Sequence, residues 1–511
     1  MWENAYYLGI DIGTFSSKGV IVDHTGAIVC ENSVPHGMEN PQPKYYEHDA
    51  EAVWWHDFCY LSGSLLERSG IRADQIAAVG ASTLGCDCLP VDEQCRPLRK
   101  AILYGIDARA DKEIRYLTEL YGDETVRRYF GRPIATGDIA AKILWIKNNE
   151  PEIYEKTSKF LTGASYIGAK LTGNYCIDRY LACASFQPMY DMNGEIRTDM
   201  CREICRPDQL AEAKTVTDII GTITEEAASQ TGLAAGTPVI TGTGDSCAEA
   251  ISSGVVRTGT AMLQFGSTLF LNLCTDRLIR DDRVKGTIFT IPGSYTVSAG
   301  TNTAGTLTNW YRDALHQDLL AVEKNGGRNA FEAMAEEAGK IAPGSGGLYT
   351  LPFFAGERSP INDPLAKGVI FGLNLSHSRA HLYRSALEGI GYCAARIMDV
   401  LREHEVFPSR IMAVGGGAKN LVWMQIIADM LGETLYIPEI TVGASYGDAL
   451  MAMIGAGALG GFRDLEKIIR IGREVYPDME NHREYRKHQE IFWTLYESTK
   501  DLMHAGASDQ N

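Results

Sequence analysis

The sequence predicts an α/β protein built from two domains, and three observations support that prediction. The chain has 511 residues, which is longer than a single hydrophobic core usually serves. Strand-like and helix-like patterns alternate from the N-terminus to about residue 254. Strand patterns then begin again within residues 261–299. We therefore expect one domain in residues 1–254 and a second in residues 255–511.

Composition limits the kinds of partner that the protein can have. Hydrophobic residues make up 45% of the chain and charged residues 22%, as in soluble globular proteins. The net charge of −17, without a run of Lys or Arg, argues against a nucleic-acid partner. An anionic small ligand is still compatible, because backbone N–H groups and a bound cation can hold phosphates.

Cysteine spacing and apolar runs bear on the cellular compartment. The twelve cysteines form no paired CxxC framework, which favours reduced thiols. The N-terminus lacks the basic segment and apolar core of a signal peptide, and no apolar run approaches the length of a membrane span. We expect a cytosolic protein without a membrane partner.

The N-terminal residues predict a β-meander whose first turn is rich in glycine and hydroxyl side chains. Apolar runs at 6–11, 19–22 and 27–29 are the three strands. Asp11 can take a hydrated Mg²⁺, and Lys18 can reach a phosphate. Between them, close backbone approach and hydroxyl contacts come from Gly13, Thr14, Ser16 and Ser17. A polar hairpin without a ligand is the alternative, and the spacing is not that of a P-loop.

An acidic residue stands at a predicted strand-to-helix corner. The apolar pair Val239 and Ile240 leads into a glycine-containing turn, and Asp245 then begins a helical pattern. The free N–H groups and the dipole of a helix N-terminus favour a charged carboxylate there. We therefore expect Asp245 to stay ionised with an ordinary pKa. An Asp that only caps its helix is the alternative.

Two further glycine turns suit a nucleotide. The first follows a strand at 261–264 and contains Gly266, Ser267 and Thr268, which can contact phosphate oxygens. The second has three consecutive glycines, Gly415 to Gly417, after a later strand. Because each glycine costs chain entropy, close approach of a planar or anionic ligand explains them better than folding does.

Two acidic loops are candidates for binding the second substrate. A buried strand at 76–81 leads into a loop with Cys86 and Asp87, and a strand at 101–104 leads into a loop with Asp107. Ligands of α/β sheets bind at the carboxyl ends of strands. A surface turn residue is the alternative for either acid.

Helical patterns occur in both predicted domains. Residues 47–66 predict an amphipathic helix with Asp49 as its N-cap. Near the other end of the chain, a strand at 434–438 and a helix at 445–454 complete the second domain.

Taken together, these turns resemble those of the FGGY family of carbohydrate kinases, members of the actin-like ATPase superfamily, over residues 6–457. The sequence GIDIGTFSSK at 9–18 is similar to the family's first phosphate loop. GVIFGL at 368–373, followed by HLYRSALE at 381–388, resembles its second signature. Residues 356–363, GERSPIND, are most similar to the xylulokinase branch.

The resemblance implies two ribonuclease-H-like domains, each a mixed sheet flanked by helices, which close on an interdomain cleft. It implies ATP and Mg²⁺ as cofactors and Asp245 as the catalytic base. The predicted metal contacts are Asp245 and Asp11, the latter from the chemistry of its own loop. The residues that it places at the nucleotide are Gly13, Thr14, Ser267, Gly305, Asn309, Gly416 and Asn420. The predicted cofactor site also includes the neighbouring Ser16, Ser17, Lys18, Gly266, Thr268 and Gly417.

The chain departs from the xylulokinase pattern where the sugar should be held. It has Gly85-Cys86-Asp87 where that branch has Met-His-Gly, and Ser246 where the branch has Asn. The loop at 105–109 is one residue longer than the branch's Asn-Asp-Gly-Arg turn. Residues 142–149 resemble the family's first signature, from which Ile139 departs. The predicted substrate-binding residues are Cys86, Asp87, Asp107, Asp245 and Ser246.

The function that the resemblance implies is ATP-dependent phosphorylation of a hydroxyl of a small sugar. The first candidate substrate is a pentulose such as D-xylulose, which would give the 5-phosphate. Gluconate, glycerol, tetritols and other ketopentoses are the alternative substrates. Two other classes of function are considered. One is an actin-like ATPase that uses ATP to change conformation, such as a chaperone or filament subunit, and the other is a non-catalytic sugar sensor. The oligomeric state is open, with a homodimer as the assembly considered.

Overall fold

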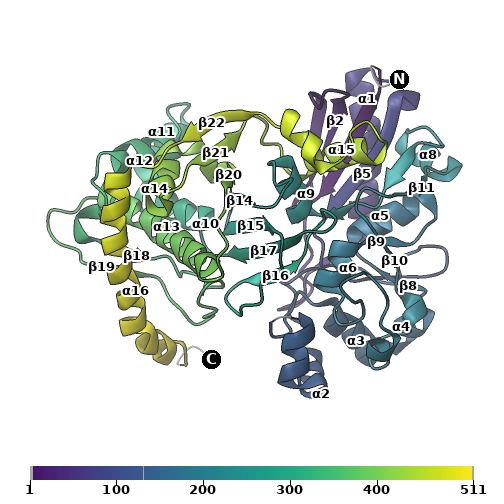
Figure 1. Ribbon diagram of the computed structural model, residues 1–511, viewed down its shortest axis with the longest axis horizontal. Coiled ribbons are helices and arrows are strands. Elements are labelled where there is room, and N and C mark those ends of the chain that lie inside the picture. Colours follow the sequence, from purple (N-terminus) through teal and green to yellow (C-terminus); the bar gives the residue numbers. More distant parts are fainter. Residues whose placement is uncertain (1–3, 131, 509–511) are drawn as a thin grey trace.

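The computed structural model describes residues 4–130 and 132–508. Two seven-stranded sheets dominate these residues, one in each half of the chain, and Figure 1 shows the two halves beside each other. The strand order is β11-β12-β5-β1-β2-β3 in the first sheet, where β13 also pairs with β5, and β16-β17-β15-β14-β20-β21-β22 in the second. The predicted α/β fold with mixed sheets in both halves is confirmed.

The first half contains the large sheet, small strand pairs and flanking helices. Its large sheet consists of β1 (Tyr6–Ile12), β2 (Ser16–Asp23), β3 (Ile28–Pro35), β5 (Ile76–Thr83), β11 (Ile219–Thr222), β12 (Pro238–Ile240) and β13 (Thr243–Gly244). The paired short strands are β4 (Glu47–His48) with β7 (Ala101–Ile102), β6 (Leu89–Val91) with β8 (Lys159–Leu161), and β9 (Cys176–Asp178) with β10 (Glu212–Lys214). The helical segments are η1 (Ala50–Trp55), α1 (His56–Ser69), η2 (Ala73–Gln75), α2 (Asp111–Phe130), α3 (Ile139–Asn149), α4 (Pro151–Lys156), α5 (Gly163–Thr172), α6 (Arg179–Ser185), α7 (Thr198–Cys201), η3 (Pro207–Gln209), α8 (Glu225–Thr231) and α9 (Asp245–Ser252).

The second half is built in the same way. Its large sheet consists of β14 (Thr260–Phe265), β15 (Leu269–Thr275), β16 (Lys285–Ile288), β17 (Tyr295–Gly300), β20 (Arg410–Val414), β21 (Leu435–Pro438) and β22 (Ile471–Val475), and β18 (Tyr349–Leu351) pairs with β19 (Val369–Phe371). The helical segments are α10 (Gly305–Leu315), α11 (Gln317–Lys324), α12 (Ala330–Gly339), η4 (Ser345–Gly347), α13 (Arg379–Glu403), η5 (Gly416–Lys419), α14 (Leu421–Leu431), α15 (Ala444–Gly455), η6 (Phe462–Lys467) and α16 (Met479–Ser508).

The two large sheets share one central topology. In the first sheet, β1, β2 and β3 form an antiparallel meander, and β5 lies parallel to β1. In the second, β14, β15 and β17 form the meander, and β20 lies parallel to β14. The strand patterns begin again after residue 255 because this topology is repeated, while the boundary at that residue stays a prediction.

The helix predicted at 47–66 is confirmed in outline. It is formed by the π-helical turn η1 and by α1, which together run from Ala50 to Ser69. The Asp49 side chain accepts hydrogen bonds from the backbone N–H groups of Glu51 and Ala52, as expected of an N-cap.

The helix predicted at 445–454 packs on the first half of the chain, although the predicted boundary assigns it to the second domain. This helix, α15, packs against β1 and β5 of the first sheet and against α9, and Figure 1 shows it beside β2 and β5. Two glycines permit the close approach. A Cβ on Gly9 would lie 2.0 Å from the carbonyl oxygen of Ser445, and one on Gly80 would lie 2.5 Å from that of Asp448. Periodicity identifies a helix, but it does not say which sheet the helix covers.

None of the helices in the described ranges is long and apolar enough to cross a membrane. All twelve cysteines lie in the described ranges as free thiols, and their reduced state stays a prediction.

Candidate active site

Asp245 is the first residue of α9, directly after the short strand β13. Gly242 makes the corner possible: its φ is +74°, and a Cβ there would lie 2.3 Å from the carbonyl oxygen of Ala81. The preceding residue Gly244 is the N-cap, so Asp245 does not cap its own helix. The predicted strand-to-helix corner is confirmed, and its acid is left free for another role.

The expectation of an ordinary pKa for Asp245 is wrong. Burial raises the pKa of this carboxyl to about 6, although the N–H of Ser246, 2.6 Å from Oδ1, favours the charged form. The side chain stays partly exposed. Desolvation therefore outweighs the helix N-terminus, and the carboxylate is a stronger base than a free Asp while it remains mostly ionised at pH 7.

Three more acids lie around Asp245. Burial, and then the charge of Asp245, raise the pKa of Asp11 to about 8 and that of Glu249 to about 7. Burial also raises the pKa of Asp448 well above its usual value. The Ser82 hydroxyl lies 3.1 Å from Asp11 and 2.6 Å from Asp448, which joins the two carboxyls. This concentration of buried acids would be relieved by a bound cation.

Sequence reasoning missed Glu249 and Asp448. Glu249 follows Asp245 by four residues on one helix, a spacing that places both side chains on the same face and so could have been noticed. Asp448 belongs to α15, which was assigned to the other half, so no signal in the sequence indicated it.

The turn at residues 13–15 is fixed by hydrogen bonds from two histidines. His36 donates through Nε2 to the carbonyl oxygen of Gly13 at 2.9 Å, and His48 donates through Nε2 to that of Thr14 at 3.1 Å. Trp54 donates to Nδ1 of His48, which fixes the tautomer of that ring. Burial and the neighbouring His36 lower the pKa of His48 to about 4. The carbonyl oxygens of Gly13 and Thr14 are therefore bonded to the histidines, and the other side of the turn is available for a ligand.

The hairpin is tighter than predicted, and this changes the role of Ser17. Asp11 pairs with Lys18 and Ile12 pairs with Ser17, so only residues 13–15 form the turn. The Ser17 side chain is fully buried, and its hydroxyl donates to Asp57 at 2.7 Å. The prediction that this hydroxyl contacts the cofactor is wrong, because strand alternation turns it into the protein. Ser16 is partly exposed and Lys18 is exposed, so both remain available.

The second half contains a cavity of about 900 Å³ where its three glycine turns meet. Seven predicted residues lie in its wall: Gly266, Ser267, Gly305, Asn309, Gly416, Gly417 and Asn420. The predicted Thr268 is not in the wall, and its carbonyl oxygen instead accepts from the N–H of Gly266 to close the turn. Aromatic and charged residues that sequence reasoning missed complete the wall, including Arg328, Phe331, Glu332, Tyr383 and Trp423. The size and the mixed lining suit a nucleotide.

Two of the three consecutive glycines have a packing reason. Gly415 has a φ of +88°, and a Cβ there would lie 2.7 Å from the carbonyl oxygen of Phe265. A Cβ on Gly417 would lie 2.7 Å from the Trp423 ring and 2.8 Å from Cβ of Phe265. A Cβ on Gly416 would meet no atom within 4 Å. The argument that folding cannot explain these glycines holds for Gly416 alone.

The active-site acid and this cavity are linked by one contact. Gln264 donates through its amide nitrogen to Glu249, which lies one helical turn after Asp245. Gln264 precedes Phe265 and Gly266, which line the cavity. The strand that forms the cavity's turn is thus attached to the helix that carries the acid.

Asp87 and Asp107 have different surroundings. Asp87 follows β5, it is fully buried, and neither of its oxygens makes a hydrogen bond of normal geometry to a described residue. Burial raises its pKa to about 7, against the opposing charge of Lys142, which donates to the carbonyl oxygens of Cys86 and Leu103. A buried carboxylate with free acceptor positions is suited to bind hydroxyl groups.

Asp107 is already fully bonded within the protein. Its oxygens accept from Arg109 at 2.7 and 3.0 Å and from the N–H of Tyr46 at 2.7 Å. The preceding strand β7 has two residues and lies outside the large sheet. The placement of Asp107 at the carboxyl end of a main-sheet strand is therefore wrong.

Cys86 is partly exposed, with its Sγ 3.1 Å from the Ser185 hydroxyl, and Ser246 is also partly exposed.

Comparison with known proteins agrees with the geometry. The model of the N-terminal domain of the FGGY family of carbohydrate kinases matches residues 6–252, and that of the C-terminal domain matches residues 261–456. The xylulose kinase of Escherichia coli (strain K12) is 28% identical over 97% of this chain and 100% of its own. The gluconokinase of Bacillus subtilis (strain 168) is 27% identical over 96% of this chain and 95% of its own.

A solved structure supports the same conclusion. The crystal structure of xylulose kinase from Rhodospirillum rubrum superposes with a TM-score of 0.88 at 26% identity, over 98% of this chain and 100% of that one. The predicted resemblance and the predicted pair of ribonuclease-H-like domains are confirmed. With both family models matched along nearly the whole length, this chain belongs to the FGGY family of carbohydrate kinases.

Proposed function

We propose that this ATP-dependent carbohydrate kinase transfers the terminal phosphoryl group of ATP to a hydroxyl of a neutral pentulose, with D-xylulose giving the 5-phosphate. The observation that carries the proposal is the position of Asp245, a base joined through Glu249 and Gln264 to the nucleotide-sized cavity. Full-length relatives include xylulose kinases and gluconokinases, so sequence similarity does not choose the sugar.

Asp87 favours a neutral sugar over a sugar acid. Its buried oxygens have open acceptor positions, which hydroxyl groups can fill. The carboxylate of gluconate would bring a second negative charge near this acid and near Asp245, and like charges in a buried site repel each other strongly. Gluconate is the second candidate because gluconokinases are similar over nearly the whole chain.

In the proposed reaction, Asp245 accepts the proton of the attacking hydroxyl. Phosphoryl transfer depends mainly on alignment and on stabilisation of charge, because its transition state is loose. The N–H groups of Thr14 and Ser267 would contact phosphate oxygens, whereas those of Gly13 and Gly266 close their own turns. The cavity lined by Gly416 and Asn420 would hold the nucleoside.

Asp11 and Asp245 are the proposed contacts of Mg²⁺. The described residues contain no group of three or more His, Cys, Asp and Glu side chains placed to hold a metal ion by themselves. In phosphoryl transfer, Mg²⁺ keeps several waters and takes one or two carboxylates together with the phosphates. Asp11 and Asp245 form such a pair, since the charge of Asp245 contributes to the raised pKa of Asp11. When bound, the ion neutralises charge on the phosphates.

The test is ADP formation with a panel of sugars. We expect D-xylulose to give the highest kcat/KM among xylulose, ribulose, gluconate, glycerol and erythritol. A preference for gluconate would overturn the argument from Asp87. ADP formation that is independent of every sugar would favour an ATPase with a conformational output instead.

The cytosolic location and the homodimer stay predictions, and light scattering of the purified protein checks the latter.

Asp245→Asn tests the base. We expect sugar phosphorylation to fall by about two to four orders of magnitude, as general-base contributions do. ATP binding, measured by calorimetry, should stay near the wild-type value because the nucleotide cavity is intact. Turnover close to wild type would show that Asp245 is not the base.

A further inference from the structure

Asp178 lies at a junction between the two halves of the chain. It ends β9 and caps α6, accepting a hydrogen bond from the N–H of Tyr180 at 3.2 Å. Its side chain is almost completely buried, with 2% of the residue exposed. Its Oδ2 also accepts from two threonine hydroxyls, Thr243 at 2.6 Å and Thr290 at 2.9 Å. A buried carboxylate is stable only with such partners.

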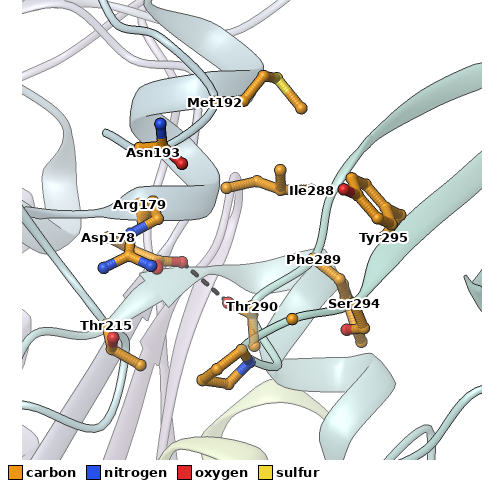
Figure 2. A pocket seen from close by; sticks show the side chains of 12 residues that line it. Asp178, Arg179, Met192, Asn193, Thr215, Ile288, Phe289, Thr290, Ser294 and Tyr295 are labelled. Carbon is orange, nitrogen blue, oxygen red and sulfur yellow. Dashed lines mark hydrogen bonds between the residues drawn. The ribbon is translucent and has the colours of Figure 1, made fainter. Parts of the chain in front are cut away.

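The two threonines come from opposite sides of the junction. Thr243 belongs to β13, which pairs with β5 of the first sheet, and it precedes Asp245 by two residues. Thr290 follows β16, the edge strand of the second sheet. Figure 2 shows Asp178 and Thr290 facing each other across the gap, with their hydrogen bond drawn. Oδ2 of Asp178 therefore connects Thr243, in the turn before Asp245, to Thr290 in the second half of the chain.

Apolar packing and a cavity both occur at this junction, where Tyr180, Phe289 and Ile291 belong to one hydrophobic cluster. A cavity of about 220 Å³ separates the two halves there. Asp178, Arg179, Met192 and Asn193 line it from the first half, and residues 288–290 and 292–295 line it from the second. The hydrogen bonds to Asp178 add a polar connection next to that cluster. Bonds to a carboxylate are about twice as strong as those between neutral groups.

We propose that Asp178 is a positioning residue for the kinase reaction: it couples the placement of Asp245 to contact with the half that binds the nucleotide. The inference rests on the proposed function, because it takes Asp245 as the base. When the second half is in place, Thr290 and Thr243 share Oδ2 of Asp178, and the turn at Thr243–Gly244 is fixed. Without that contact, the turn loses one of its anchors. Displacements of about 1 Å are enough to reduce rates about a hundredfold.

The chain offers a matched control for the test. Thr287 lies on β16, its residue is 4% exposed against 3% for Thr290, and its hydroxyl has no hydrogen-bond partner among the described residues. Thr287→Val and Thr290→Val make the same chemical change in neighbouring buried positions. Only the second removes a bond to Asp178.

The experiment compares kcat and the two KM values of Thr290→Val, Thr290→Ser and Thr287→Val with those of the wild type. We expect Thr290→Val to lower kcat at least tenfold, with both KM values changed less than threefold. Thr290→Ser, which keeps the hydroxyl, should restore most of the activity, and Thr287→Val should match the wild type. Equal kcat values for Thr290→Val and Thr287→Val would overturn the inference, and so would loss of kcat in Thr290→Ser equal to that in Thr290→Val.

A second measurement tests the coupling without activity. Urea unfolding of Thr243→Val, Thr290→Val and the double variant should give losses of stability that are not additive, since both hydroxyls bind one oxygen. Additive losses would overturn the coupling. If the wild-type protein phosphorylates none of the sugars, the proposed function is wrong, whereas the unfolding cycle still tests whether Thr243 and Thr290 are coupled across the two halves.

Discussion

At the scale of single residues, the active site is defined by acids whose surroundings differ. Asp87 is fully buried and Asp245 is partly exposed; both make few hydrogen bonds, and desolvation raises the pKa of both. Asp107 is equally acidic in sequence, but it is saturated by Arg109 and Tyr46. The sequence identified all three acids because each follows a strand pattern. It could not separate them, since the difference lies in partners that are distant in the chain.

This contrast predicts different effects of two matched substitutions. Asp87→Ala should raise the KM for the sugar about tenfold or more and leave the KM for ATP nearly unchanged. Asp107→Ala should lower the melting temperature, because Arg109 is left buried without its main partner. Steady-state kinetics and thermal melting of both variants check this. A selective effect on sugar KM from Asp107→Ala would restore the role that the sequence suggested for it.

At the scale of elements, the positions of the turns were predicted better than the roles of the residues in them. Strand and helix patterns located the hairpin after Asp11, the corner at Asp245 and the turn at Gly415 within a few residues. The inward direction of Ser17 depends on how far the strands extend, and pattern boundaries are the least certain part of such a prediction. The packing roles of Gly415 and Gly417 depend on Phe265, 150 residues earlier, so local sequence could not show them.

The three glycines should respond differently to alanine. Gly416→Ala should leave the melting temperature unchanged, because a Cβ there meets no atom of the protein. If the nucleotide occupies the cavity, the KM for ATP should rise severalfold. Gly415→Ala should be destabilised by at least about 1 kcal/mol, because its φ is +88° and Phe265 leaves no room. Thermal melting and ATP kinetics measure both. An unchanged KM for ATP in Gly416→Ala would place the nucleotide elsewhere.

At the scale of the whole molecule, length and alternation were sufficient to predict two α/β domains, whereas the shared fold of the two was implied by the family resemblance. The exception is α15, which is distant in sequence from the sheet that it covers. Its helical pattern was plain, whereas its partner was set by Gly9 and Gly80, whose missing side chains make the space. Asp448 on α15 lies close to Asp11 on β1, so the pKa values of these acids depend on the packing of this helix on the first sheet.

The raised pKa values predict an unusual pH dependence of stability for the protein without ligands. A carboxyl whose pKa is higher in the folded state binds protons more tightly there, so its contribution is full below about pH 4 and is lost as pH rises through the folded value. We therefore expect the melting temperature to fall between about pH 5 and pH 8. The groups are Asp178 and Asp245 at about 6, Asp87, Glu249 and Glu357 at about 7, and Asp11 at about 8.

Melting curves at pH 5 and pH 8 measure this effect. Asp87→Asn should reduce the difference between the two temperatures, because an amide does not titrate. Asp57 and Asp363, whose pKa values are lowered by hydrogen bonds to His36 and His504 despite their burial, act below about pH 4 and do not interfere. A melting temperature that is constant or rises over this range would contradict the assignment.

The return of α15 to the first sheet also has a consequence for synthesis. On the ribosome, a domain folds when all of its parts have emerged. Tyr7, Val20 and Ala78 share a core with Leu450 and Met453, so their apolar surface stays uncovered until almost the whole 511-residue chain has been made. An N-terminal fragment ending at residue 254 would expose that surface permanently and would aggregate. The apolar surface of the first half therefore stays partly uncovered during synthesis until the late helix α15 has been made.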